Sequence, residues 1–276
     1  MSGPELPAAE ELKSCCAAAY GQDAVALLLG EAYHPGGQAL TNRLAGALEL
    51  RSGQHVVDIA SGPGTTARLL ASGHGAEVTG VELNPSSVDA AQRAAAQDGL
   101  AERVRFLVGD AERLPLPDDA ADAVLCECAF CTFPDKATAA AEFARVLEPG
   151  GRVGITDVTA RPGGLPDELS GLTAWVACIA DARPMADYRA ILEEAGLRVR
   201  HAQDHDEALR NMISTIEARL KFLRMTDPAR LTRAGVDVEA VLHHTRLAAE
   251  ATADGALGYA LITAEKPLHA ADLDAS

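Results

Sequence analysis

The chain alternates short apolar runs with helical segments, and this order limits the folds open to it. Three intervening segments, at 65–73, 86–99 and 135–151, have helical periodicity and a glycine near their end. Strands that alternate with helices pair in parallel through right-handed crossovers. The pattern therefore predicts an α/β sheet covered by helices on both faces. The expected strands are HVVDIA (55–60), EVTGVE (77–82), VRFLVG (104–109), DAVLCE (122–127) and RVGITD (152–157).

Further elements are expected on both sides of this core. Two more strands are predicted at 197–202 and 257–265, and helical segments near 169–179, 185–195, 206–224 and 236–253. Together these elements predict a Rossmann-like, seven-stranded, doubly wound sheet in one domain. Its expected parts are an N-terminal helical cap (1–50), a ligand-binding core (51–160), a C-terminal part with helical insertions that completes the sheet and the substrate pocket (161–268), and a tail (269–276).

The charge balance narrows the choice of partners. The chain has 24 Lys and Arg against 40 Asp and Glu, a formal charge of −16, and no basic run. Such a field repels phosphate backbones and anionic lipids. No stretch approaches the roughly 18 apolar residues of a membrane span, and the first residues lack a signal-peptide pattern. We expect a cytoplasmic protein with a small-molecule partner, without nucleic acid or membrane; the oligomeric state stays open.

The turn after the first expected strand lies where a doubly wound sheet binds its ligand. It reads Asp58-Ile59-Ala60-Ser61-Gly62-Pro63-Gly64-Thr65. Gly62 and Gly64 would let the backbone approach a ligand without a Cβ in the way. Thr65 or Thr66 could cap the helix that follows. A third glycine at the dinucleotide spacing is missing, because position 67 is alanine.

Acidic residues follow at the ends of the next two strands. Glu82 can accept hydrogen bonds from ribose hydroxyls, in nicotinamide cofactors and in S-adenosylmethionine alike. Asp110, before Ala111, can accept from an adenine amino group. The three features together predict an adenosine-containing cofactor. A nicotinamide or flavin protein, or a tight turn without a ligand, is the alternative.

The motifs VVDIASGPGTTA, VTGVELNPSSV, GDAERLPLPDDAADAVLCE and ARVLEPGGRVGITDV, within about residues 50–160, resemble class I methyltransferases. Small-molecule enzymes of ubiquinone biosynthesis and arsenite methylation carry this pattern. The resemblance implies an enzyme that transfers a methyl group from S-adenosyl-L-methionine to a nucleophile held at the strand ends. It implies cofactor contacts at Asp58, Ala60, Gly62, Gly64, Thr65, Glu82, Leu83, Asp110, Ala111 and Glu127.

Three cysteines gather near the end of the fourth expected strand. Strand alternation would place Cys126 and Cys128 on one face and Glu127 on the other, with Cys131 in the following loop. A cluster of thiols at this edge could hold a soft metal or metalloid. Core packing is the alternative for each of them, because free cysteine is among the most buried residue types.

A second resemblance concerns residues 127–136, ECAFCTFPDK, and the Trp175-Val176-Ala177-Cys178 segment. They are similar to elements of the arsenite methyltransferase family. This resemblance implies that Cys128 and Cys178 bind arsenic. Cys131, and Cys15 or Cys16 as a third thiol, are further candidates outside the resemblance. The family's further cysteines have no counterpart at matching positions.

The expected substrate is therefore a trivalent arsenical, arsenite or methylarsenite, held by thiolates. Its lone pair would attack the methyl carbon, so no general base is needed. The alternative is an O-, N- or C-methyltransferase of a small organic metabolite. Candidate bases would then be Glu127, Asp157 and His34, with Tyr20 and Tyr33 shaping the pocket. A second alternative is a non-catalytic sensor of thiol-reactive ions that binds the cofactor.

Overall fold

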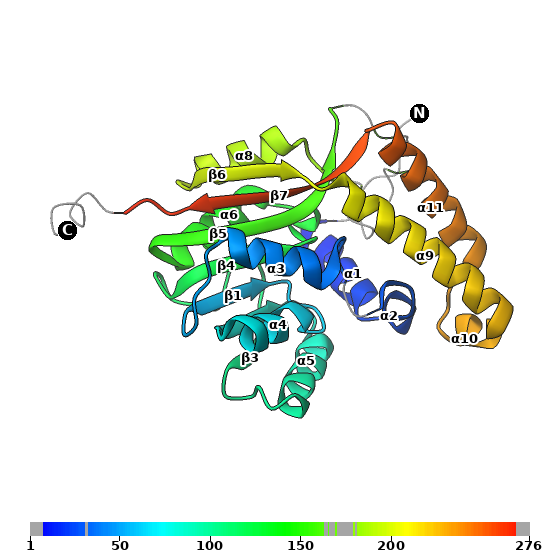
Figure 1. Cartoon of the computed structure of the whole chain (residues 1–276), viewed down its shortest axis with the longest axis horizontal. Coiled ribbons are helices and arrows are strands. Elements are labelled where there is room, and N and C mark those ends of the chain that lie inside the picture. The colour runs from blue at the N-terminus through cyan, green and yellow to red at the C-terminus, as the bar shows by residue number, and fades with distance from the viewer. Residues whose placement is uncertain are drawn as a thin grey trace.

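A seven-stranded sheet forms the centre of the molecule, with helices on both faces (Figure 1). The structure is a computed structural model that describes residues 8–30, 33–162, 165, 169, 179 and 181–268. The strand order is β3-β2-β1-β4-β5-β7-β6, which confirms the predicted fold class. The strands are β1 (His55–Ile59), β2 (Glu77–Glu82), β3 (Val104–Val108), β4 (Ala121–Glu127), β5 (Leu147–Ala160), β6 (Arg198–Asp204) and β7 (Leu257–Glu265).

Ten α-helices and one 3-10 turn accompany the strands in the described part of the chain. The helix expected near 169–179 lies almost entirely outside the described residues. The short helix α10 was not expected. The helices are α1 (Ala9–Tyr20), α2 (Asp23–Leu29), α3 (Gly37–Ala47), α4 (Thr65–His74), α5 (Pro85–Gln97), α6 (Lys136–Val146), α8 (Met185–Glu194), α9 (Asp206–Thr226), α10 (Pro228–Arg233) and α11 (Val238–Ala253), and the 3-10 turn is η1 (Phe130–Thr132).

The order of the strands reverses between β1 and β4. Both neighbours of β1, which are β2 and β4, run parallel to it, and Ile59 lies opposite Cys126. A ligand site is expected beyond the carboxyl ends of the strands at such a switch point. The prediction of parallel strands is correct for β1 to β5. No direction was predicted for the last two strands; β7 runs antiparallel to both β5 and β6.

Helices cover both faces of the sheet, so its central strands are apolar along their whole length. Val56, Val57 and Ile59 of β1 are each no more than 1% exposed. α3 packs closely on β5: a Cβ at Gly154 would lie 2.7 Å from the side chain of Leu44. This close contact fixes the start of α3, and the segment before it, beside the strand ends.

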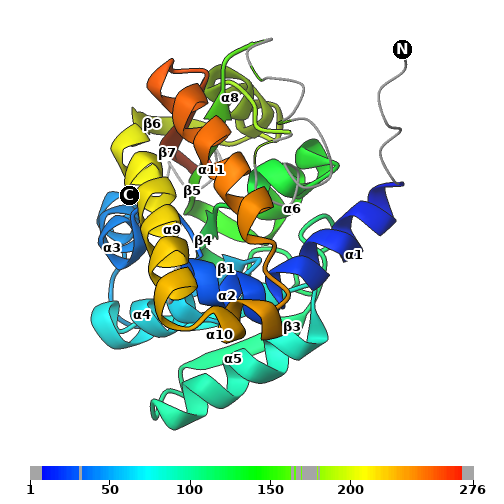
Figure 2. The same cartoon turned by 90° about the vertical axis from the view of Figure 1, so that its right-hand side faces the viewer.

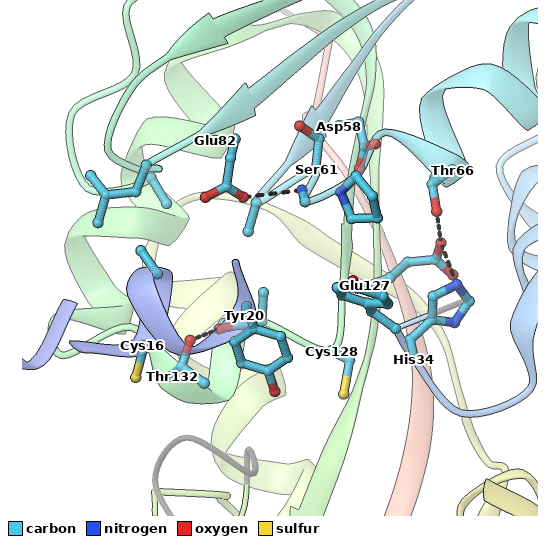
Figure 3. A pocket seen from close by; sticks show the side chains of 18 of the residues that line it. Cys16, Tyr20, His34, Asp58, Ser61, Thr66, Glu82, Glu127, Cys128 and Thr132 are labelled. Atoms are coloured by element: carbon cyan, nitrogen blue, oxygen red, sulfur yellow. Dashed lines mark hydrogen bonds and ion pairs between the residues drawn. The ribbon is translucent and has the colours of Figure 1, made fainter. Parts of the chain in front are cut away.

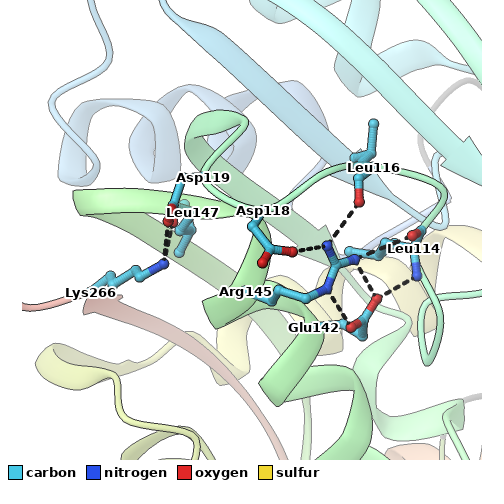
Figure 4. A network of polar contacts seen from close by, with 8 residues as sticks. All are labelled: Leu114, Leu116, Asp118, Asp119, Glu142, Arg145, Leu147 and Lys266. Atoms are coloured by element: carbon cyan, nitrogen blue, oxygen red, sulfur yellow. Dashed lines mark hydrogen bonds and ion pairs between the residues drawn. The ribbon is translucent and has the colours of Figure 1, made fainter.

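Arg145 of α6 organises the loop between β3 and β4 (Figure 4). Its guanidinium donates to Glu142 and to Asp118, at 2.7 and 2.8 Å, and to the carbonyl of Leu116 at 2.8 Å. Glu142 in turn accepts from the backbone N–H of Leu114. A single side chain thereby holds the loop that leads from the β3 end back to β4.

The cap and the C-terminal helices lie in front of the carboxyl ends of the strands, as Figure 2 shows. α9 and α11 form an antiparallel pair that packs through Leu220 and Leu223. Arg219 of α9 donates to the carbonyl of Leu28 in α2 at 2.7 Å. The C-terminal helices thus support the cap. No helix in the described part of the chain is long and apolar enough to cross a membrane.

Candidate active site

A pocket of about 1080 Å3, partly open to solvent, lies at the carboxyl ends of β1, β2 and β4 and against α1. Nine of the ten predicted cofactor contacts line it. In Figure 3, Glu82 and the pair formed by Glu127 and His34 lie on opposite sides, with Cys128 and Tyr20 between and below them. The nine residues are Asp58, Ala60, Gly62, Thr65, Glu82, Leu83, Asp110, Ala111 and Glu127.

The two glycines of the β1 turn have different roles. Both have positive φ, 50° at Gly62 and 75° at Gly64. Gly62 faces the pocket, where a Cβ would meet only a carbonyl oxygen 4.0 Å away. A Cβ at Gly64 would instead lie 2.4 Å from Phe106. Gly64, the predicted contact outside the pocket lining, is therefore required for packing against β3.

Glu82 fixes the geometry of the same turn. Its carboxylate accepts from the N–H of Gly62 at 3.0 Å and from the N–H of Asn84 at 2.8 Å. Burial raises the pKa of Glu82, and the N–H groups of Asn84, Gly62 and Leu83 partly oppose this rise. The residue holds two strand ends together while it lines the pocket.

Asp58 is a buried carboxylate, and its Oδ2 has no hydrogen-bond partner among the described residues. Burial raises the pKa of Asp58 well above its ordinary value, and the nearby carboxylates of Glu127 and Glu82 raise it further. The hydroxyl of Ser61 in the same wall is likewise buried and unpartnered in the described part. A cationic ligand would compensate this concentration of negative charge.

Glu127 connects four elements at the pocket floor. Its carboxylate accepts from the hydroxyls of Thr41 in α3, at 2.9 Å, and Thr66 in α4, at 2.8 Å. His34 Nε2 lies 3.5 Å from it. The predicted helix cap by Thr65 or Thr66 is therefore wrong: Gly64 is the N-cap of α4 without a side-chain cap bond, and Thr66 donates to Glu127.

The cysteines do not form the expected cluster. Cys128 follows directly after β4 with a left-handed backbone, φ 55°, and lines the pocket beside Glu127. Cys126 is fully buried in the core and lies outside the pocket lining, so it does not join Cys128 in the pocket. The turn at Cys128 interrupts the strand alternation on which the expected cluster depended. Cys131 is also buried, 1% exposed, and lies outside the pocket lining.

Asp157, one of the candidate bases, has a structural role. Asp157 is buried and accepts from the N–H groups of Cys131, at 2.8 Å, and of Val158, at 2.7 Å. It lies outside the pocket lining and holds the loop after β4, so it does not serve as a base there. Cys178 lies outside the described residues. Where placement is described, no three Cys, His, Asp or Glu residues are grouped to hold a metal ion.

The sequence reasoning missed the contribution of α1. Lys13, Cys16, Ala17 and Tyr20 of this helix line the pocket. Lys13 Nζ lies 2.8 Å from Asp110 Oδ2 and 2.5 Å from Glu112 Oε2. Almost a hundred residues separate these partners, and the periodicity of α1 gives no signal for such a contact.

Comparison with known proteins shows to which family the chain belongs. Residues 57–155 match a family model described as a methyltransferase domain. The 27-O-demethylrifamycin SV methyltransferase of Amycolatopsis mediterranei is 32% identical over 230 residues, which cover 83% of each chain. The Halobacterium salinarum arsenite methyltransferase is 32% identical over 159 residues, 56% of this chain and 40% of that protein.

A solved structure shows the same fold. Phosphoethanolamine N-methyltransferase 2 of Haemonchus contortus, in complex with S-adenosyl-L-methionine, superposes with a TM-score of 0.79 at 18% identity, over 97% of this chain and 61% of that one.

The chain belongs to the class I methyltransferases. It is an S-adenosylmethionine-dependent enzyme, as the sequence motifs predicted, and it is similar over most of its length to the rifamycin enzyme. The pocket fits this cofactor, because the sulfonium and ammonium groups are cations and Asp58, Glu82 and Glu127 supply carboxylates. Small-molecule methylation is the established class of reaction.

Proposed function

We propose that the enzyme methylates a hydroxyl group of a small, largely apolar organic molecule. The observation that carries this proposal is the composition of the pocket lining outside the predicted cofactor contacts. It includes Tyr20, Tyr33, Ala129, Cys128 and Phe133, which offer apolar and aromatic contact. The similarity to the rifamycin enzyme, an O-methyltransferase by name, adds support.

The proposed cofactor roles follow from position. Glu82 would accept from the ribose hydroxyls, Asp110 from the adenine amino group, and Asp58 would face the cationic methionine portion. Leu83 and Ala111 would flank the adenine, and Ala60, Gly62 and Thr65 would contact the methionine portion through the β1 turn. When bound, S-adenosylmethionine supplies an electrophilic methyl group. The chain's residues position it and the acceptor for in-line transfer.

A hydroxyl acceptor must lose a proton, and we assign its acceptance to His34. Of the three candidate bases, His34 and Glu127 line the pocket. Glu127 already accepts from two hydroxyls and is 4% exposed in its side chain, so it is better suited to stabilise an imidazolium than to move. His34 Nδ1 lies 3.2 Å from the carbonyl of Pro35, and Nε2 lies 3.3 Å from Thr41 Oγ1. With the Nδ1–H donated to Pro35, Nε2 is the nitrogen that can take the proton, and Glu127 lies 3.5 Å from it.

The test of this role is kcat for His34→Asn with a hydroxyl acceptor. We expect kcat to fall about 100-fold while the affinity for S-adenosylhomocysteine stays within two-fold of wild type. His74→Asn is the matched control, because His74 is partly exposed, pairs with Asn42 and lies outside the pocket lining. A kcat within two-fold of wild type in His34→Asn would remove His34 as the proton acceptor.

A second candidate acceptor is a trivalent arsenical. Cys128 and Cys16 line the same pocket from β4 and from α1, and this placement favours a soft acceptor bridged between two thiolates. The arsenic lone pair would attack the methyl carbon, the carbon–sulfur bond would break, and no proton would move. Cys178 remains a proposed ligand from the family resemblance, and Cys131 a proposed helper.

One acceptor screen separates the two candidates. Purified enzyme with labelled S-adenosylmethionine and a thiol reductant is offered phenols, aliphatic alcohols, arsenite and methylarsenite. Methylated hydroxyl products that persist in Cys128→Ser support the first candidate. Methylated arsenic that is lost in Cys128→Ser and Cys16→Ser, but kept in Cys15→Ser, supports the second. Cys15 is the control because it neighbours Cys16 on α1 and lies outside the pocket lining.

A further inference from the structure

α1 has little apolar anchoring of its own. Of its twelve residues, only Leu12 and Cys16 are buried. Yet the helix supplies a wall of the pocket through Cys16, Ala17 and Tyr20. Polar contacts must therefore contribute much of what holds this wall in place.

Among the polar contacts of α1, those of Lys13 and Ala17 end on the cofactor side of the pocket. Lys13 reaches Asp110 and Glu112, which follow β3. Asn84, which follows β2, donates from Nδ2 to the carbonyl of Ala17 at 3.0 Å. The same Asn84 donates its backbone N–H to Glu82. α1 is thus tied to the two loops that are expected to contact adenine and ribose.

The ion pair of Lys13 is protected from solvent. Its side chain is 9% exposed, so salt screens the contact less than it would screen a surface pair. Burial alone would lower the pKa of Lys13, but its hydrogen bonds to Asp110 and Glu112 raise that pKa above the ordinary value. The ammonium group is therefore charged near neutral pH.

Asp110 can serve Lys13 and a cofactor at the same time. Its Oδ2 accepts from Lys13, and its Oδ1 accepts from the N–H of Glu112 at 2.9 Å. An ionised carboxylate offers about four lone-pair sites, so acceptor capacity remains for an amino group. Without Lys13, the carboxylates of Asp110 and Glu112 would repel each other, and the loop that carries Asp110 would lose its counter-charge.

We propose that Lys13 is a positioning residue for the cofactor: by neutralising Asp110 and Glu112 it holds α1 against the adenine end of the pocket and slows cofactor release. This inference goes beyond the proposed acceptor and holds whichever acceptor is correct, because it concerns the cofactor end alone.

The experiment compares Lys13→Met, Lys13→Arg and Glu112→Gln with the wild-type enzyme. We expect Lys13→Met to weaken S-adenosylhomocysteine binding about 5- to 20-fold by calorimetry, mainly through faster dissociation. KM for S-adenosylmethionine should rise while kcat changes less than two-fold. Lys13→Arg should restore most of the affinity. Lys221→Met is the control, since Lys221 pairs with Glu217 on the exposed face of α9.

Glu112→Gln tests whether Lys13 acts on the cofactor through its contact with Glu112. It removes one carboxylate partner of Lys13 and leaves Asp110 intact. The Lys13→Met/Glu112→Gln double variant should bind the cofactor no more weakly than Lys13→Met alone, because the two residues act through one contact. Cofactor affinity within two-fold of wild type in Lys13→Met, or a lowered thermal midpoint as the sole change, would overturn the proposal. Should Lys13→Met fail to fold, unchanged cofactor dissociation in Lys13→Gln would overturn the proposal equally.

Discussion

Ala60 and Cys128 occupy equivalent positions at the ends of neighbouring strands and share a left-handed backbone. Ala60 directly follows β1 with φ 54°, and Cys128 directly follows β4 with φ 55°. This conformation costs a non-glycine residue about 1–2 kcal/mol. Both residues line the pocket. Two of the four non-glycine residues with positive φ in the described part therefore lie where strands turn aside to open the site.

Enlarging Ala60 should expose this strain. We expect Ala60→Val to lower the free energy of unfolding by about 1–3 kcal/mol, because β-branched residues tolerate positive φ poorly. Ala60→Gly should stay within about 1 kcal/mol of wild type. Urea unfolding measures both. Glu49→Val is the matched control: Glu49 has φ 50° but lies outside the pocket, so only stability should fall. Wild-type stability in Ala60→Val would contradict this account.

Asp58→Asn should stabilise the fold and lower the affinity for the cofactor. An ordinary aspartate has a pKa of about 3.9, and burial raises that of Asp58 in the folded state. The folded chain therefore binds this proton more tightly, and stability falls as pH rises from about 4 through the raised pKa. The variant lacks this loss, so its stability advantage should grow between pH 5 and pH 8 in denaturant titrations.

Cofactor binding should show the opposite pH trend at the same residue. A cationic ligand favours the ionised carboxylate, so wild-type affinity for S-adenosylmethionine should increase with pH over the range in which Asp58 ionises. Calorimetry in two buffers of different ionisation heat should detect proton release. In Asp58→Asn, both the pH dependence and the proton release from this group should vanish. If the stability advantage of Asp58→Asn over the wild type shrank with rising pH, the raised pKa of Asp58 would be contradicted.

Glu82→Ala should weaken cofactor binding by at least tenfold, which corresponds to about 1.4 kcal/mol. The change removes the proposed ribose contact and frees the N–H groups of Gly62 and Asn84. Calorimetry with S-adenosylmethionine measures the effect. Asp122→Asn, at the opposite end of the strands, is the control. Unchanged affinity in Glu82→Ala would remove the cofactor assignment.

Glu127→Ala should destabilise the fold by about 2–4 kcal/mol, because it leaves the hydroxyls of Thr41 and Thr66 and the ring of His34 without their shared acceptor. Thr41→Val removes one donor and should cost less, about 1 kcal/mol. Thermal and denaturant unfolding check the order of the two variants. Equal losses would show that the carboxylate does not connect these elements.

The strands of the core could be predicted because a strand that is buried on both faces consists of consecutive apolar residues. The turn at β1 and the acids at 82 and 110 could be predicted for a related reason, since their positions follow from the strand ends. Local pattern failed where the backbone departs from a regular element. Cys128 has a positive φ directly after β4 and lines the pocket, whereas Cys126 within β4 is buried in the core.

Contacts between segments that are distant in the chain could not be predicted from the sequence either. Lys13 meets Asp110 and Glu112 only because α1 folds across the strand ends. The hydroxyl of Thr66 has a capping position by sequence, yet it donates to Glu127 because β4 brings that carboxylate within 2.8 Å. In both cases the tertiary fold supplies a stronger partner than the local backbone.

The position of the antiparallel strand β7 has a consequence for folding during synthesis. In the described sheet, β6 pairs with β7 alone, and β7 separates it from β5. During synthesis, β6 therefore emerges from the ribosome long before its neighbour exists. The first five strands can assemble as the chain grows, but the edge of the sheet can close only when residues 257–265 have been released.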